Sequence, residues 1–132
     1  MNDRELLELA AKAAGLHIGS DQGDYQYRDG GTWVAGLYAT DNGYSLFWNP
    51  LIDDRDALRL AVKLRLDIEH GCELDNDRYV YVSRHGIELV RDPVGCWEEI
   101  EDEDHRAAAT CRAITRAAAE IGARITDAGG GS

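Results

Sequence analysis

The sequence has few of the residues that mark several common protein classes. Its 132 residues include three cysteines, two prolines and one phenylalanine, and 14 Lys and Arg stand against 25 Asp and Glu. Three widely spaced cysteines do not make a disulfide framework, which favours a reducing compartment. The formal net charge of −11 opposes direct binding to nucleic acid or to an anionic membrane surface.

Long hydrophobic runs are also missing. The opening MNDRELLELAAK has no cationic segment followed by an apolar run, and no stretch approaches the roughly 18 apolar residues of a spanning helix. We therefore expect a cytoplasmic protein. An apolar share of 44% is sufficient for a core, and the length suits one domain. We expect a single domain over residues 1–125 and a flexible Gly-rich tail over 126–132.

Metal and phosphate motifs are lacking as well. The histidines and cysteines include the donor types that zinc prefers, but no C-x-x-C or H-x-x-x-H spacing occurs. Asp53, Asp54 and Asp56 lack the glycine and terminal Glu of a calcium loop, so we expect them to cap a helix. No glycine-rich phosphate loop is present. We predict no metal ion and no cofactor.

Hydrophobic periodicity predicts three helices. In the first, Asp3 caps a helix that runs to about Ala14, where Gly15 ends it. The second begins after Asp53 or Asp54 and continues to about Glu69. The third covers about 104–123, and its apolar stripe contains Ala107, Cys111, Ile114, Ala118 and Ile121.

Two hairpins are predicted between the helices. The runs 32–40 and 44–49 flank an Asn-Gly turn, and the runs 78–84 and 87–91 flank His85 and Gly86. Tyr25 and Tyr27 suggest a further short strand. In 78–84, Tyr79 and Tyr81 alternate with two valines and so point to the opposite face.

Apolar side chains occupy both faces of the first hairpin: Trp33 and Leu37 lie on one face, Val34 and Tyr38 on the other. Strands with two apolar faces require cover on both sides. We therefore predict an α+β fold, a three-layer α/β/α sandwich with a mostly antiparallel sheet of about five strands and three helices. Most strand aromatics, Tyr79 and Tyr81 included, would then pack beneath helices.

Three segments resemble the small phage and prophage proteins of the phage ABA sandwich domain family. They are Arg4–Gly15 (RELLELAAKAAG), Trp48–Leu64 (WNPLIDDRDALRLAVKL) and Thr110–Gly122 (TCRAITRAAAEIG). The middle segment is the most specific, because its Trp, Pro, paired Asp and helical pattern occur together. The resemblance implies a sheet between helical layers and an origin in a temperate phage or prophage. It supplies no catalytic or ligand-binding residues.

Two features are candidates for a protein-binding site. An acidic run places six carboxylates in seven positions, where they would attract a cationic surface or cap the last helix. Tyr25 and Tyr27 lie beside a polar, glycine-rich loop, which favours exposed aromatic anchors. The members of the acidic run are Glu98, Glu99, Glu101, Asp102, Glu103 and Asp104.

Three functional hypotheses remain open. The first is a small phage accessory protein that binds a host protein and inhibits a bacterial antiviral defence system, its carboxylates replacing phosphates in a basic, nucleic-acid-binding groove. The second is an enzyme acting on a small molecule, with a pocket at the helix–sheet boundary lined by some of Cys96, His85, Asp92 and Trp97. The third is a homo-oligomeric structural protein, which the net charge disfavours.

Overall fold

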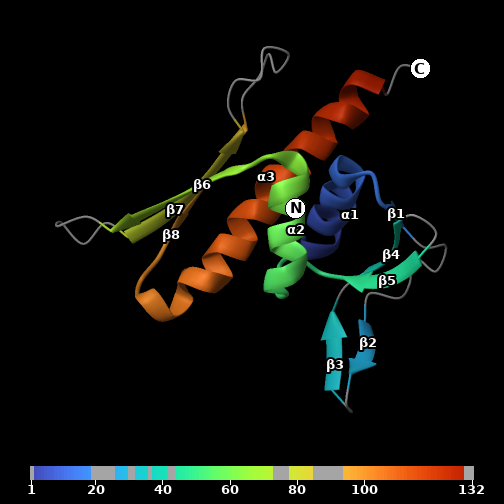
Figure 1. The fold of residues 1–132 in the computed structure, drawn as a ribbon, viewed down its shortest axis with the longest axis horizontal. Coiled ribbons are helices and arrows are strands. Elements are labelled where there is room, and N and C mark those ends of the chain that lie inside the picture. Colours follow the sequence, from blue (N-terminus) through green and yellow to red (C-terminus); the bar gives the residue numbers. More distant parts are fainter. Residues whose placement is uncertain are drawn as a thin grey trace.

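The computed structural model describes residues 2–18, 26–29, 32–35, 37–41, 44–72, 78–84 and 94–129. These residues form three α-helices, one short 3-10 helix and eight strands (Figure 1). The helices are α1 (Asp3–Ala14), α2 (Asp54–Leu64), η1 (Glu103–His105) and α3 (Arg106–Gly129). The strands are β1 (His17–Ile18), β2 (Gln26–Asp29), β3 (Thr32–Ala35), β4 (Leu37–Asp41), β5 (Tyr44–Trp48), β6 (Asp67–Cys72), β7 (Arg78–Arg84) and β8 (Val94–Glu99). The predicted mixture of helices and antiparallel strands is confirmed.

The described strands form three antiparallel sheets, with the orders β1-β4-β5, β2-β3 and β6-β7-β8. The predicted hairpin around the Asn-Gly pair is β4–β5, in which Asp41 lies opposite Tyr44. The predicted strand 32–40 is divided, because Thr32–Ala35 pairs with β2 in a separate sheet. In the third sheet, Glu69, Tyr81 and Trp97 lie side by side across the three strands. The predicted strand 87–91 lies outside the described residues, and β7 pairs with β6 and β8 instead.

The three-layer α/β/α sandwich with about five strands is not confirmed. The helices occupy the middle of the described structure: α3 packs on β7 and β8, and α1 contacts β1 and β4 (Figure 1). The physical reason is that α1 buries its apolar stripe mainly against α3, and α3 divides its own between α1, α2 and one face of the β6-β7-β8 sheet. Each helix then has little apolar surface left with which to cover the second face of a sheet.

The contact between α1 and α3 is built from small side chains. Ala10 and Ala11 on α1 and Ala117 and Ala118 on α3 have no exposed surface. At Gly122 the two backbones approach so closely that an added Cβ would lie 1.9 Å from the Leu9 carbonyl oxygen. Small residues at such a crossing let the helix axes approach and increase dispersion contacts.

Helix boundaries follow capping. Asn2, and not the predicted Asp3, caps α1: its side chain accepts from the Glu5 backbone amide at 2.8 Å. Gly15 ends the helix with φ +75° as predicted. Asp53 caps α2 as predicted. This second helix stops at Leu64, before the predicted end at Glu69, because Arg65 adopts a left-handed conformation with φ 56°. The third helix continues through Gly129, past the expected domain end at residue 125.

The segment with the most specific family resemblance forms the entry to α2. Trp48, Asn49 and Pro50 are buried. The Asn49 side-chain oxygen accepts from the Leu51 backbone amide at 3.0 Å. The backbone amide of Asn49 donates to the Asp56 carboxylate at 2.9 Å. These contacts fix a turn and a helix start, so the segment has a structural role. Among the described helices, none combines the length and hydrophobicity that a membrane crossing requires.

Candidate functional site

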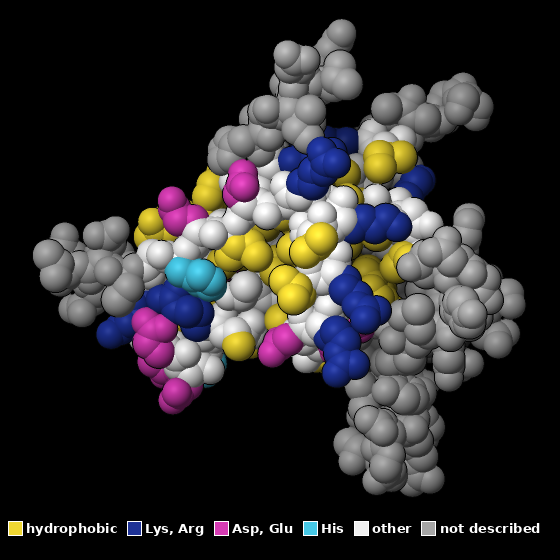
Figure 2. Space-filling model, viewed as in Figure 1, with side chains coloured by type: hydrophobic (Ala, Val, Ile, Leu, Met, Phe, Trp, Pro, Cys, Tyr) yellow, Lys and Arg dark blue, Asp and Glu magenta, His cyan; other side chains and the backbone are white. Residues whose placement is uncertain are grey.

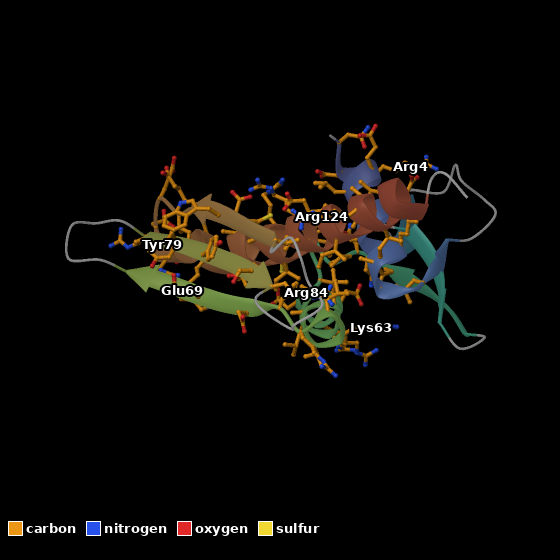
Figure 3. The ribbon with its side chains drawn as sticks, turned by 90° about the horizontal axis from the view of Figure 1, so that it is seen from above. Arg4, Lys63, Glu69, Tyr79, Arg84 and Arg124 are labelled. Atoms are coloured by element: carbon orange, nitrogen blue, oxygen red, sulfur yellow. The ribbon has the colours of Figure 1, made fainter. Side chains whose placement is uncertain are left out.

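One face of the β6-β7-β8 sheet packs on α3 through buried Val80, Val82 and Cys96. Strand alternation places a different set of residues on the other side, which we call the outer face. In Figure 3 the strands lie in front of α3, with Tyr79 and Glu69 on the near side. By the strand register, the outer face carries Asp67, Glu69, Gly71, Tyr79, Tyr81, Ser83, Gly95, Trp97 and Glu99.

Three aromatic rings form a cluster on the outer face. Tyr79 and Trp97 are stacked, with centroids 4.0 Å apart and planes inclined by 14°. Tyr81 is tilted against Trp97, with centroids 6.1 Å apart. The Tyr79 hydroxyl donates to Glu69 at 3.1 Å, which fixes the direction of its ring. Trp97 is nevertheless 47% exposed, so an aromatic surface faces solvent.

Two glycines make room for the tyrosine rings. A Cβ at Gly71 would lie 1.8 Å from Tyr79 Cε1, and a Cβ at Gly95 would lie 2.2 Å from the Tyr81 hydroxyl. Each ring therefore lies across a neighbouring strand at a position without a side chain. The two glycines thus let the tyrosine rings lie against the neighbouring strands, and Trp97 stacks on Tyr79.

Carboxylates flank the aromatic cluster. Glu69 and Glu99 are both exposed, and they lie on the two edge strands on either side of β7. Aromatic faces attract cations, and a guanidinium both stacks on such rings and pairs with carboxylates in a planar fork. The outer face thus offers the groups that an arginine side chain prefers.

Three of the six carboxylates of the predicted acidic run bond to other side chains of the same protein. Glu98 accepts from Arg116 at 3.0 Å, and Asp102 caps η1 and contacts His105 Nδ1 at 2.7 Å. Glu103 pairs with Arg106 at 2.6 Å. Hydrogen bonds from these partners lower the pKa of Asp102 and of Glu103, and the bond to Asp102 raises the pKa of His105.

Of the other predicted site residues, three are exposed and two are the tyrosines, whose side chains the structure does not describe. Glu99, Glu101 and Asp104 are exposed, so they remain candidates for an interface. Tyr25 lies outside the described residues. Tyr27 lies in β2 opposite Val34, and its side chain is not described.

Arg106 joins the start of α3 to the sheet, a role that the sequence did not predict. Its guanidinium donates to the carbonyl oxygens of Gly71 at 3.0 Å and of Tyr79 at 3.1 Å. Glu103 holds the same group from the other side. The bidentate pair fixes both strands that carry Tyr79 and its glycine, so Arg106 supports the outer face from beneath.

Two grooves contain cysteines. Cys96 and Glu120 line one of about 340 Å³, and Cys111, Asp54 and His70 line another of about 370 Å³. Burial raises the pKa of the Cys96 thiol to about 11, and the charge of Glu120 adds to the shift. Burial and a hydrogen bond to Asp54 raise the pKa of Cys111 to about 12. A thiol nucleophile requires a shift in the other direction.

We expect both thiols to alkylate slowly in the native protein. With pKa values near 11 and 12 instead of 9.0, their thiolate fraction at about pH 8 falls by about a hundredfold or more. Iodoacetamide labelling followed by mass spectrometry, on a Cys72→Ser variant with the unfolded chain as reference, measures this. Native labelling at the unfolded rate would contradict the assigned environments.

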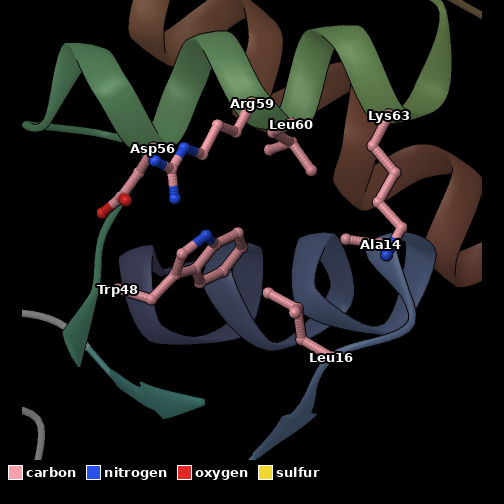
Figure 4. A pocket seen from close by; sticks show the side chains of 7 residues that line it. All are labelled: Ala14, Leu16, Trp48, Asp56, Arg59, Leu60 and Lys63. Carbon is pink, nitrogen blue, oxygen red and sulfur yellow. The ribbon is translucent and has the colours of Figure 1, made fainter. Parts of the chain in front are cut away.

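A smaller cavity of about 70 Å³ lies between α1 and α2, above Trp48 (Figure 4). Arg59 and Lys63 extend from α2 toward it, and Leu16 closes it from the α1 side. Burial raises the pKa of Asp56, which also lines it. Ligand sites usually enclose roughly 300–1,000 Å³, so this cavity has room for about two water molecules.

In the part of the chain that the structure describes, no three His, Cys, Asp or Glu side chains are grouped to hold a metal ion. Comparison with protein families, with curated proteins and with solved structures finds no match.

Proposed function

We propose that this protein acts by binding a basic protein, with the outer face of the β6-β7-β8 sheet as its contact surface. The observation that carries the proposal is the exposed Trp97, stacked on the half-buried Tyr79 between two exposed glutamates. Interfaces are enriched in such aromatic residues, and their anchors carry most of the binding energy.

Charge supports the same class of partner. A net charge of −11 speeds encounter with a cationic surface and suppresses binding to polyanions. Glu99, Glu101 and Asp104 extend the acidic surface from the end of β8 to the start of η1. Arginines on a partner would stack on Tyr79 and Trp97 and pair with Glu69 and Glu99.

The proposed biological setting follows from the family resemblance and from this charge. The chain would be a phage or prophage accessory protein in the host cytoplasm that occupies the nucleic-acid site of a basic defence complex, with carboxylates replacing phosphates. Salt-sensitive copurification with such a complex would support this setting. A low-salt capture that retains no basic nucleic-acid-binding protein would contradict it.

The alternative of an enzyme with a Cys, His and Asp pocket has weaker support. Cys96 and Trp97 are adjacent in β8, so their side chains point to opposite faces of the sheet and do not line one cavity. His85 and Asp92 lie outside the described residues. The raised thiol pKa values at Cys96 and Cys111 also disfavour a cysteine nucleophile.

A calorimetric titration with an oligoarginine peptide tests the proposed surface. We expect Glu69→Gln/Glu99→Gln to weaken binding by about five- to tenfold, because both carboxylates that flank the rings lose their charge. The matched control is Asp3→Asn/Glu5→Gln on α1, which removes two exposed charges outside the acidic surface and is expected to have less than about a twofold effect. Equal losses in both variants would mean general charge attraction without a defined site.

A further inference from the structure

Four large apolar side chains are exposed on the side of the molecule that carries α2. The exposed fractions are 61% for Ile52, 60% for Leu58, 69% for Val62 and 36% for Ile68. Leu58 and Val62 lie one turn apart on α2, and Ile68 follows on β6. Figure 2 shows hydrophobic side chains gathered over this region. Contiguous apolar patches of this kind mark interaction sites on soluble proteins.

The patch borders the groove of about 370 Å³ that contains Cys111. Leu58 of α2 and Ile68 of β6 line its two sides, and Ala107, Cys111 and Ile114 of α3 lie in it as well. Its volume is within the roughly 300–1,000 Å³ range of known binding clefts. The groove is therefore a concave, mostly apolar surface bordered by a helix.

Cations line the side of α2 that faces away from the sheet. Arg55, Arg59 and Lys63 repeat at i, i+4 spacing and are all exposed, and Figure 2 shows Lys and Arg side chains beside the hydrophobic patch. The carboxylates of α2 lie at its N-terminus: Asp53 caps the helix, Asp54 accepts from the Cys111 thiol at 3.3 Å and Asp56 from the Asn49 backbone amide. The row of three cations is therefore the basic part of this helix on an acidic protein.

We propose that this groove is a second docking surface, which binds an amphipathic helix with apolar side chains at i, i+4 and i+7 and acidic residues along one flank. The spacing of Leu58 and Val62 matches anchors that repeat once per turn. The row of Arg55, Arg59 and Lys63 matches the acidic flank. The groove lies on the α3 side of the β6-β7-β8 sheet, opposite the outer face, so both surfaces are accessible at once and the chain is able to link two partners.

Fluorescence anisotropy with the full chain and a synthetic helical peptide tests this proposal. The peptide carries leucines at i, i+4 and i+7 and glutamates along one flank, and its counterpart carries lysines in place of the glutamates. We expect Leu58→Gln/Val62→Gln to weaken glutamate-peptide binding by about tenfold or more. Ile125→Gln, on α3 and with 46% exposure, is the matched control and leaves binding unchanged. Arg59→Glu/Lys63→Glu reverses the preference between the two peptides.

Three results would overturn the proposal: no binding of the glutamate peptide to the wild-type chain, equal binding by Leu58→Gln/Val62→Gln, or equal affinity for both peptides. Sedimentation distinguishes the helical partner from a second copy of this chain in the groove. A wild-type dimer that Leu58→Gln/Val62→Gln converts to a monomer would identify the second copy as the occupant. Glutamine is a good helix former, so the exposed substitutions preserve α2. Oligoarginine binds the opposite face. A loss of oligoarginine binding therefore tests the outer face, and a loss of glutamate-peptide binding tests the groove.

Discussion

Replacing Gly122 with alanine is expected to lower the free energy of unfolding by about 2 to 3 kcal/mol. The new Cβ would lie 1.9 Å from the Leu9 carbonyl oxygen and 2.8 Å from its carbon. Both are backbone atoms, so relief requires α1 to move away from α3. That movement loosens the buried contacts of Ala10, Ala11 and Ala118. Urea unfolding followed by circular dichroism gives the difference.

The sign of this effect distinguishes packing from helix propensity. In an exposed helical position, alanine is more favourable than glycine by about 1 kcal/mol. The matched control is Ala108→Gly on the exposed side of α3, which we expect to cost about 1 kcal/mol. A stabilised Gly122→Ala protein would show that α1 and α3 do not cross closely at this residue.

Replacing Trp97 with alanine is expected to weaken binding to a basic partner, or to the oligoarginine probe, by about tenfold or more. Trp97 is the most exposed ring of the outer face and stacks on Tyr79, so its removal takes away a cation-binding surface and frees its neighbour. Trp97→Phe keeps an aromatic face and is expected to retain most of the affinity. Calorimetry on the three proteins measures the series.

A second variant tests ring placement without removing a ring. Gly71→Ala forces the Tyr79 ring from its position, because the added Cβ would lie within 2.3 Å of three ring atoms. We expect weaker binding with the cooperative unfolding transition retained, since Trp97 and Tyr79 both lie outside the buried core cluster. Undiminished affinity in Trp97→Ala and Gly71→Ala would place the binding surface elsewhere.

Much of the helical structure followed from local chemistry, and the failures have identifiable causes. Gly15 and Asp53 mark the end of α1 and the start of α2 through backbone preferences that a sequence displays. The end of α2 depends on Arg65 in a left-handed conformation, which is uncommon for a residue with a side chain. Ile68 continues the helical spacing of apolar residues, so the pattern predicted helix where strand β6 forms.

Strand β8 and the outer face depend on strand pairing, which local sequence preferences do not reveal. Val94–Glu99 contains Gly95 and two glutamates, which are poor strand formers alone, and pairing with β7 makes it a strand. The alternation of Tyr79 and Tyr81 with buried Val80 and Val82 was predicted correctly. The expectation that these tyrosines pack beneath helices was wrong, because α3 covers the valine side. The sequence did contain a signal for one exposed face, because the strand places tyrosines on one side and valines on the other.

The acidic run shows the limit of composition. Six carboxylates in seven positions suggested one continuous epitope, yet Glu98, Asp102 and Glu103 bond to Arg116, His105 and Arg106. Those partners lie later in the chain, and only the folded α3 and η1 bring them into range. Glu69 joins the candidate site from β6, which no sequence pattern connected with Trp97.

The indole N–H signal of Trp97, followed by NMR while oligoarginine is added, shows directly whether the outer face binds a basic partner. We expect a saturable shift of the Trp97 signal, assigned with Trp97→Phe, while the signal of Trp48 stays in place because that ring is only 4% exposed. Saturable binding of the peptide with an unmoved Trp97 signal would contradict this expectation.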